Sequence, residues 1–265
     1  MELELLYEPP GLPAFDLPPE LAAAYPGTLG FEETRVFANF VATVDGVVAI
    51  PAVAQSNRLI AAGSAADRFV MGLLRACADA VLLGSGTLAA SPGGVWTPEQ
   101  AFPGAAGGFA ELRRRLGLAP VPEVVVLTAS GRVDPSHPAF EAGALVLTTD
   151  GGRDALADRL PGAAALVSTG PGPELEPHAA LAALRERGRR RLLHEGGPHA
   201  IGSFLAAGAV DELFLTVSPL LAGRGPDARL ALVERADLLP GLPARLAGVR
   251  RESDHLFLRY VTAAR

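Results

Sequence analysis

The fold is indicated first by one stretch, which joins an apolar run to a glycine-rich turn: Ala80-Val81-Leu82-Leu83-Gly84-Ser85-Gly86-Thr87-Leu88-Ala89. The apolar run has the length of a buried strand, and Gly84 ends it. The turn fits the G-x-G-x-x-A form of a loop whose backbone can approach a pyrophosphate. A Rossmann unit would place an acidic residue about 20 residues later, at the end of the next strand. Here the next apolar run, Val124–Leu127, begins about 40 residues on and ends at Thr128. The stretch therefore favours a nucleotide-phosphate loop of another fold, with a plain strand-to-helix turn as the alternative.

The rest of the chain continues this alternation of strand and helix patterns. We expect strands at Val36–Val44, Ala80–Leu83, Val124–Leu127, Ala144–Thr148, Ala164–Val167, Arg191–Glu195, Leu213–Val217 and His255–Val261. We expect helices at Asp67–Cys77, Glu111–Leu116, His178–Arg187 and Pro198–Ala207. Alternating strands and helices predict an α/β fold with a mostly parallel sheet and helices on both faces. The last strands lack intervening helices, which indicates antiparallel additions at one end.

No linker divides this alternation, so one domain is expected over residues 31–265. The proline-rich residues 1–30 predict an extended arm with one helical turn at Glu20–Tyr25. The glycine- and proline-rich stretch Ser91–Gly108 predicts a long surface loop. Arg113-Arg114-Arg115 is interpreted as a solvated helix face.

Composition excludes several classes of function. The 265 residues carry 23 basic and 29 acidic side chains, a formal net charge of −6, which disfavours nucleic acid as a partner. Cys77 is the single cysteine, so no disulfide framework and no cysteine-based metal site are expected. All basic residues are arginine, which excludes Schiff-base and P-loop chemistry. There is neither a signal-peptide pattern nor a stretch of about 20 apolar residues, which predicts a cytoplasmic protein that does not interact with membranes.

A second glycine motif, Glu195-Gly196-Gly197-Pro198, stands between a predicted strand and a predicted helix. Two glycines permit unusual dihedral angles and close approach of a ligand, and proline suits the first turn of a helix. Glu195 would lie at the carboxyl end of a strand, where open α/β sheets place their ligand-binding groups. A plain loop is the alternative.

Polar residues also follow one face of the first strand. Asn39, Thr43 and Asp45 share this face because side chains alternate along a strand, which indicates a lined cleft. The alternative is that Thr43 and Asp45 satisfy hydrogen bonds of a local turn. The histidines are scattered without the spacing of a metal site, so no metal is expected.

Together these segments resemble the pyrimidine reductases of riboflavin biosynthesis, which share the dihydrofolate-reductase-like fold. The resemblance rests on blocks in family order, namely Asn39–Gly46, Leu74–Ala76, Ala78–Thr87, Glu195–Pro198, Val210–Leu213 and Ser218–Gly223. The chain has no H-x-E or P-C-x-x-C signature, so we do not expect it to contain the zinc deaminase half that often precedes such a reductase.

The resemblance implies an NADPH-dependent reductase similar to 5-amino-6-(5-phosphoribosylamino)uracil reductase, with the pyrophosphate at the N-terminus of the Pro198 helix. The cofactor-binding residues that it implies are Ala42, Gly84, Gly86, Thr87, Ser91, Ser130, Gly196, Gly197, Pro198, His199, Ala200, Ile201 and Gly202. The substrate-binding residues are Asn39, Asp45, Ser56 and Glu195. No catalytic residue is assigned.

The chain departs from the family mainly in the substrate half. Val47 follows Asp45-Gly46 where the family often has a basic residue, and Ser91 occupies the place of a usual aspartate. No arginine occurs between Arg75 and Arg113 to meet a ribose phosphate. The alternatives are therefore a dihydrofolate-reductase-like enzyme with another substrate and a non-catalytic NADPH-binding relative.

Two further expectations concern cofactor choice and assembly. NADPH is expected to be preferred over NADH, with Arg132 or Ser130 meeting the 2′-phosphate through charge-assisted hydrogen bonds; a solvated turn is the alternative for these two residues. A homodimer is expected because Val210–Val217 and His255–Val261 are apolar and would leave an exposed sheet edge unless covered.

Overall fold

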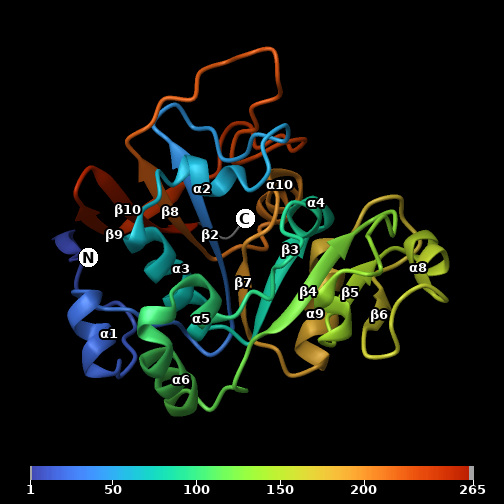
Figure 1. The fold of residues 1–265 in the computed structure, drawn as a ribbon, viewed down its shortest axis with the longest axis horizontal. Helices are drawn as coiled ribbons and strands as arrows, with labels where there is room; N and C mark the ends of the chain where they lie inside the picture. Colours follow the sequence, from blue (N-terminus) through green and yellow to red (C-terminus); the bar gives the residue numbers. More distant parts are fainter. Residues whose placement is uncertain (1, 263–265) are drawn as a thin grey trace.

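A mixed β-sheet runs through the molecule and positions every other element (Figure 1). The computed structural model describes residues 2–262. Within them the strand order is β1-β9-β10-β8-β2-β7-β3-β4-β5-β6. The strands are β1 Glu4–Tyr7, β2 Arg35–Thr43, β3 Ala80–Gly84, β4 Glu123–Thr128, β5 Leu145–Thr148, β6 Ala165–Ser168, β7 Arg191–His194, β8 Glu212–Ser218, β9 Ala244–Glu252 and β10 His255–Thr262.

The strands from β8 across to β6 pair in parallel, while β1, β9, β10 and β8 pair antiparallel. The central strands are apolar on both faces, as parallel strands covered by helices require. The predicted α/β fold, with antiparallel strands added at one end, is confirmed. Sequence analysis missed β9, the long partner of β10.

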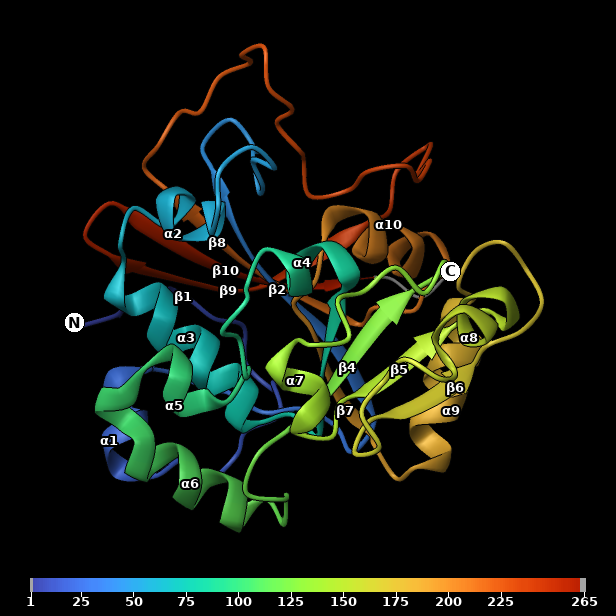
Figure 2. The same cartoon turned by 45° about the vertical axis from the view of Figure 1, so that its right-hand side comes forward.

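Helices cover both faces of the sheet (Figure 2). They are α1 Pro19–Ala24, α2 Ser56–Ile60, α3 Ala65–Ala76, α4 Ser85–Ala89, α5 Pro98–Ala101, the 3₁₀ turn η1 Pro103–Ala105, α6 Ala106–Arg115, α7 Pro138–Glu141, α8 Asp150–Leu156, α9 Pro177–Glu186 and α10 Pro198–Ala206. One core lies under α3 and α6 and includes Phe69, Phe109 and Leu193. The other lies under α9 and α10 and includes Leu184, Phe204 and other residues of these helices.

The first thirty residues, expected to be an extended arm, supply a strand and a helix to the domain. β1 pairs with β9 in the sheet, and Leu21 and Tyr25 of the α1 segment are buried. The Arg250 guanidinium lies 3.9 Å from the centroid of the Tyr25 ring and donates to Glu8. Apolar burial and a charge-assisted contact therefore fix this segment to β9.

The stretch Ser91–Gly108 is more ordered than the surface loop predicted for it, since it contains α5, η1 and the start of α6 and buries Trp96. The prediction that Arg113 is solvated is also wrong. Its guanidinium is buried and donates to the carbonyl oxygens of Ala119 (2.7 Å), Arg75 (3.0 Å) and Ala78 (2.8 Å). Charge patterning alone could not separate Arg113 from its exposed neighbours, because two of these acceptors lie at or just after the end of α3, which only the fold brings close to α6.

Neither of the strands expected to form an exposed edge does so. β8 lies between β10 and β2, and β10 lies between β9 and β8. The edges of the described sheet are β1 and β6. The edge argument for a homodimer is therefore removed by the pairing of these strands.

Candidate functional site

The carboxyl ends of the parallel strands meet at one edge of the sheet, where α4 follows β3 and α10 follows β7. Loops at this edge bind ligands in open α/β sheets, because helix N-termini and free backbone groups converge there. Both glycine motifs lie at this edge, as Figure 2 shows from the positions of α4 and α10. The edge is therefore the candidate site.

The two glycine turns are packed against each other. A Cβ added to Gly196 would lie 2.2 Å from the backbone nitrogen of Gly84 and 2.4 Å from the Cα of Leu83, so no side chain fits. Gly197 has φ +37°, and its N–H donates to Thr87 Oγ1 at 2.9 Å. The sequence-predicted residues Gly84, Thr87, Gly196 and Gly197 thus form one unit.

Helix α10 begins at this unit. Its first turn contains Pro198, His199 and Ala200, and the N–H groups of His199 and Ala200 precede the first possible intrahelical acceptor. His199 is exposed and Ala200 half-buried, so this turn is open to a ligand. Ile201 is fully buried in the core, and a Cβ at Gly202 would lie 2.7 Å from the Glu234 carbonyl oxygen. The side of α10 at Ile201 and Gly202 therefore packs against protein.

An arginine-lined cleft adjoins α4, with a cavity volume of about 510 Å³. Its lining comes from α4, the loop after β4 and the end of the α8 segment, and consists of Ser85, Leu88, Ala89, Ser130, Gly131, Arg132, Val133, Asp134, His137, Ala155 and Arg159. Ser130 and Arg132 were predicted to bind the 2′-phosphate. Sequence analysis missed Arg159, because only the fold brings it to this cleft.

Gly86, Ser91 and Ala42 take different positions at this edge. A Cβ added to Gly86 meets nothing within 4 Å, so the face of α4 at Gly86 is open. The backbone oxygen of Ser91 lies 2.9 Å from His137 Nε2, which ties α4 to the loop before α7. Ala42 is buried in β2.

The side chains of Asp45 and Ser56 are already engaged in hydrogen bonds within the protein. The Asp45 carboxylate accepts from Thr43 Oγ1 and from the N–H groups of Ala222 (3.0 Å) and Gly223 (2.7 Å). These hydrogen bonds, that from Thr43 first, lower the pKa of Asp45 to about 2. Ser56 Oγ accepts from the Ile50 N–H at 3.0 Å. The local-turn alternative therefore describes Thr43, whose hydroxyl bonds Asp45 and Val47, whereas Asp45 also ties this turn to the loop after β8.

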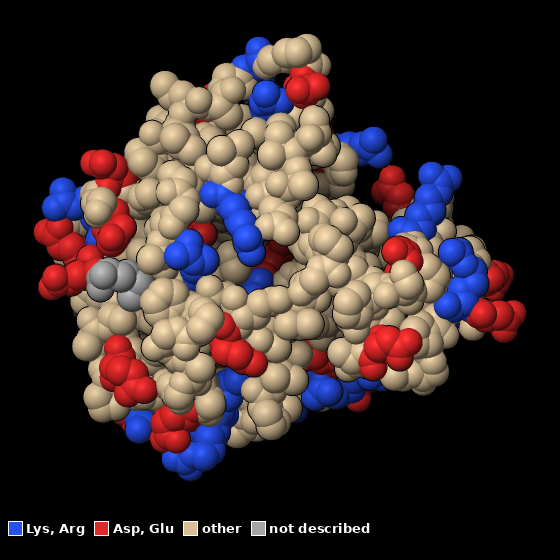
Figure 3. Space-filling view, in the orientation of Figure 1, with Lys and Arg blue, Asp and Glu red and all other residues tan. Residues whose placement is uncertain are grey.

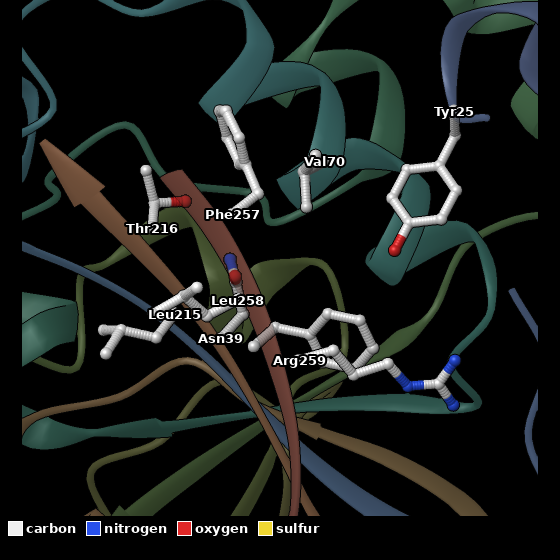
Figure 4. Close-up of a pocket in the computed structure, with 9 residues that line it drawn as sticks. Tyr25, Asn39, Val70, Leu215, Thr216, Phe257, Leu258 and Arg259 are labelled. Carbon is white, nitrogen blue, oxygen red and sulfur yellow. The ribbon is translucent and has the colours of Figure 1, made fainter. Parts of the chain in front are cut away.

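Asn39 does not reach the open edge. It is 7% exposed and lines a small cavity of about 10 Å³ between β2, β8, β10 and α3 (Figure 4). Thr216 and Arg259 line the same cavity. Such a volume is about that of one water molecule, so Asn39 lies too deep to contact a ring-sized substrate in this structure.

Glu195 forms a buried ion pair with Arg75 of α3. The side chains are 6% and 7% exposed, and the nitrogen-to-oxygen distances are 2.6 Å for Nη2–Oε2 and 2.9 Å for Nε–Oε1. Arg75 Nη1 also donates to the Thr97 carbonyl oxygen at 3.2 Å. The Arg75 guanidinium therefore makes a bidentate contact with the carboxylate that was predicted to face the substrate.

A second buried acid lies near this pair. Asp67 of α3 is 4% exposed and makes a side-chain hydrogen bond with Thr216. Burial raises the pKa of Asp67, and the nearby charge of Glu195 acts in the same direction. Figure 3 shows basic and acidic side chains around a hollow near the middle of this face of the molecule.

The family follows from the sequence itself. Residues 34–238 match the model of the RibD C-terminal domain. The chain belongs to the RibD C-terminal domain family. Among curated proteins, none matches the chain.

Solved structures support the same fold. A pyrimidine reductase-like protein from Corynebacterium diphtheriae has a TM-score of 0.71 at 22% identity over 87% of this chain and 92% of that one. RibD from Acinetobacter baumannii gives 0.61 at 20% identity, and the match spans 87% of this chain but 58% of that one. The riboflavin biosynthesis reductase Rib7 of Saccharomyces gives 0.60 at 13% identity over 92% and 99%. The predicted pyrimidine reductase family and its α/β fold are thus confirmed.

No helix within residues 2–262 is long and apolar enough to cross a membrane. In the same range, no cluster of three or more His, Cys, Asp or Glu side chains could hold a metal ion.

Proposed function

We propose that the protein is an NADPH-dependent reductase that transfers hydride to a pyrimidine- or pteridine-type substrate, similar to 5-amino-6-(5-phosphoribosylamino)uracil reductase. The contact between the two glycine turns at the start of α10 carries the proposal. The first turn of α10 stays open, and α4, which contacts the start of α10 through Thr87, also lines the cleft that contains Arg132 and Arg159. A dinucleotide with a 2′-phosphate needs one site for its pyrophosphate and a basic site for the third phosphate.

The residues present fit such a ligand. Thr87 Oγ1 already accepts the Gly197 N–H, so its own hydroxyl proton is available to a phosphate oxygen. The N–H groups of His199 and Ala200 would meet the pyrophosphate, and the helix dipole favours its charge. Arg132 and Arg159 would hold the 2′-phosphate.

When bound, NADPH supplies the hydride, and the chain positions the two partners. Glu195 stands at the end of β7, next to the turn, and Arg75 fixes its carboxylate in one orientation. A carboxylate oxygen with a free lone pair can accept an N–H of a pyrimidine or pteridine ring. We therefore assign substrate orientation to Glu195, with Arg75 as its support.

Three observations also support the alternatives, namely an enzyme with a substrate other than the phosphoribosylamino-pyrimidine or a protein that binds NADPH without catalysis. Asn39 is buried beside a small cavity, and the Asp45 carboxylate is engaged by Ala222 and Gly223. The chain also lacks an arginine between Arg75 and Arg113. The substrate half thus offers fewer free polar groups than the cofactor half.

Titration calorimetry with NADPH, followed by turnover assays, tests the proposal. We expect NADPH to bind and its absorbance to fall with at least one pyrimidine or pteridine substrate. Binding without oxidation on any substrate of either class would support the non-catalytic alternative. Failure to bind NADPH at all would contradict both. The homodimer remains a proposal that rests on likeness to paired reductases, and light scattering tests it.

A further inference from the structure

His194, the last residue of β7, is a fully buried imidazole in which only one ring nitrogen has a partner. The ring packs between Phe40 and Phe204, with centroid distances of 6.5 Å and 5.1 Å. Its Nδ1 accepts the Gly196 N–H at 3.4 Å. Its Nε2 has no hydrogen-bond partner within residues 2–262.

These contacts define the protonation of the ring. Because Nδ1 accepts a hydrogen bond, the proton of the neutral imidazole is on Nε2. Burial lowers the pKa of His194 to about 3, so the ring is neutral near pH 7. A buried N–H without an acceptor is unfavourable. Leucine, as at Leu192 on the same face of β7, would avoid it.

The hydrogen bond that Nδ1 accepts indicates the role of the His194 side chain. The Gly196 backbone is pressed against Leu83 and Gly84 with no room for a Cβ. The next N–H, of Gly197, is held by Thr87. His194 and Thr87 therefore hold two consecutive N–H groups of the turn that leads into α10.

We propose that His194 is a positioning residue, which fixes the Gly196-Gly197 turn through Nδ1 and so keeps the first turn of α10 ready for the dinucleotide. Apolar packing alone does not explain a histidine here, because the ring buries an unpaired N–H. This inference rests on the proposed NADPH site and adds to it a residue that the ligand does not touch. His194 raises cofactor affinity at a cost to the stability of the fold.

Two substitutions separate the hydrogen bond that His194 accepts from the apolar packing of its ring. His194→Leu keeps an apolar side chain of similar size but removes the acceptor. His194→Asn is smaller but places an amide oxygen on Cγ, where Nδ1 is attached, so that the Gly196 N–H keeps an acceptor. We expect the Kd for NADPH to rise about fivefold in His194→Leu, the factor that one neutral hydrogen bond represents. In His194→Asn it should stay within about twofold of the unsubstituted protein.

A matched control comes from the opposite end of α10. His178 Nε2 lies 2.9 Å from the carbonyl oxygen of Ala207, so His178→Leu also removes one ring hydrogen bond to this helix. Its NADPH Kd should not change. If the unsubstituted protein fails to bind NADPH, the proposed function fails. If that protein binds and folded His194→Leu binds equally well, only the role of His194 is overturned.

Nitrogen NMR of the imidazole gives a test that needs no variant to fold. We expect a neutral ring with its proton on Nε2 at pH 5, and a shift of the Nδ1 resonance when NADPH is added. A ring that titrates near pH 6.5, or that carries its proton on Nδ1, would overturn the proposal.

Discussion

Arg75 and Glu195, which are 120 positions apart in the chain, form a two-pronged ion pair beneath the candidate site. Arg75 comes from α3, and Glu195 follows β7, so the pair joins one covering helix to the turn before α10. A third donor, Nη1, links the same guanidinium to the Thr97 carbonyl oxygen. The orientation of Glu195 is therefore set by α3 and by the segment before α5.

Breaking this pair should destabilise the fold. In Glu195→Gln the Arg75 charge stays buried without its counter-charge, and loss of one member of a buried pair costs about 3–5 kcal/mol. We expect a decrease near the lower limit in the free energy of unfolding, measured by urea denaturation. The double variant Arg75→Met/Glu195→Leu should regain part of the loss, because no charge is then left unpaired. Equal stability of Glu195→Gln and the unsubstituted protein would show that the pair is solvated.

Gly86→Ala should leave the fold intact and weaken NADPH binding. The position is helical, and the added Cβ meets nothing within 4 Å, so alanine should stabilise α4 by about 0.5–1 kcal/mol. The same Cβ would extend into the space proposed for the cofactor. Thermal melts should show an equal or higher Tm without ligand and a smaller rise with NADPH. A normal rise with NADPH would place the cofactor away from α4.

Gly196→Ala, in contrast to Gly86→Ala, should destabilise the fold. Its Cβ would lie 2.2 Å from the Gly84 nitrogen, and backbone cannot yield as a flexible side chain does. We expect a loss of several kcal/mol in unfolding free energy, since overpacking a dense interior costs about 1–3 kcal/mol even where neighbours can shift. Circular dichroism with urea titration measures this. A stable Gly196→Ala would mean that the two turns can separate.

The sequence predicted most of the sheet because its strands carry local signals. Val81 to Leu83 and Val124 to Leu127 are apolar on both faces, which is the pattern of covered parallel strands. β9 escaped prediction because Ala244–Glu252 mixes glycine and several arginines with few apolar residues. Arg250 is buried there through its contacts with residues of the N-terminal segment, among them Glu8, Tyr25 and Pro26, which lie more than 220 positions away. Such a strand is set by tertiary pairing rather than by propensity.

The candidate site, like the sheet, was predicted only in part from the sequence. The glycine turns were predicted because close backbone approach requires glycine, and glycine is visible in a sequence. The partners of the polar residues were not predicted. The packing of α3 determines whether the Glu195 carboxylate pairs with Arg75 or stays available to a ligand. The burial of Asn39 depends on the packing of α3 and β10.

The cleft beside α4 should determine which dinucleotide binds. Removing one charged partner of a phosphate costs about 1.5–3 kcal/mol, so Arg132→Ala and Arg159→Ala should each weaken NADPH binding at least tenfold. NADH affinity should change little, because NADH has no 2′-phosphate. Calorimetry with both dinucleotides measures the ratio. Arg153→Ala, on α8 just before Arg159, is a control, since Arg153 is exposed and does not line the cleft. Equal losses for NADPH and NADH would assign these arginines a different role.

The pH dependence of stability should reveal the buried His194. Its pKa is about 3 in the fold and about 6.5 when unfolded, so between these values the unfolded chain binds a proton that the folded chain does not. The fold is therefore destabilised as the pH falls through this range, by up to about 1.4 kcal/mol per pH unit. Urea titrations between about pH 4.5 and 7 should show a steeper decline for the unsubstituted protein than for His194→Leu.

The difference between these two proteins isolates the histidine. Asp67, whose pKa is raised by burial, acts with the opposite sign, and its stabilising effect is lost as the pH rises past its folded pKa. Asp45, with a pKa of about 2, changes the stability of the fold mainly at pH values below those of these urea titrations. Both groups are present in the unsubstituted protein and in His194→Leu, so their contributions cancel in the difference. Parallel stability curves for the two proteins would mean that His194 is solvated and can be protonated in the fold.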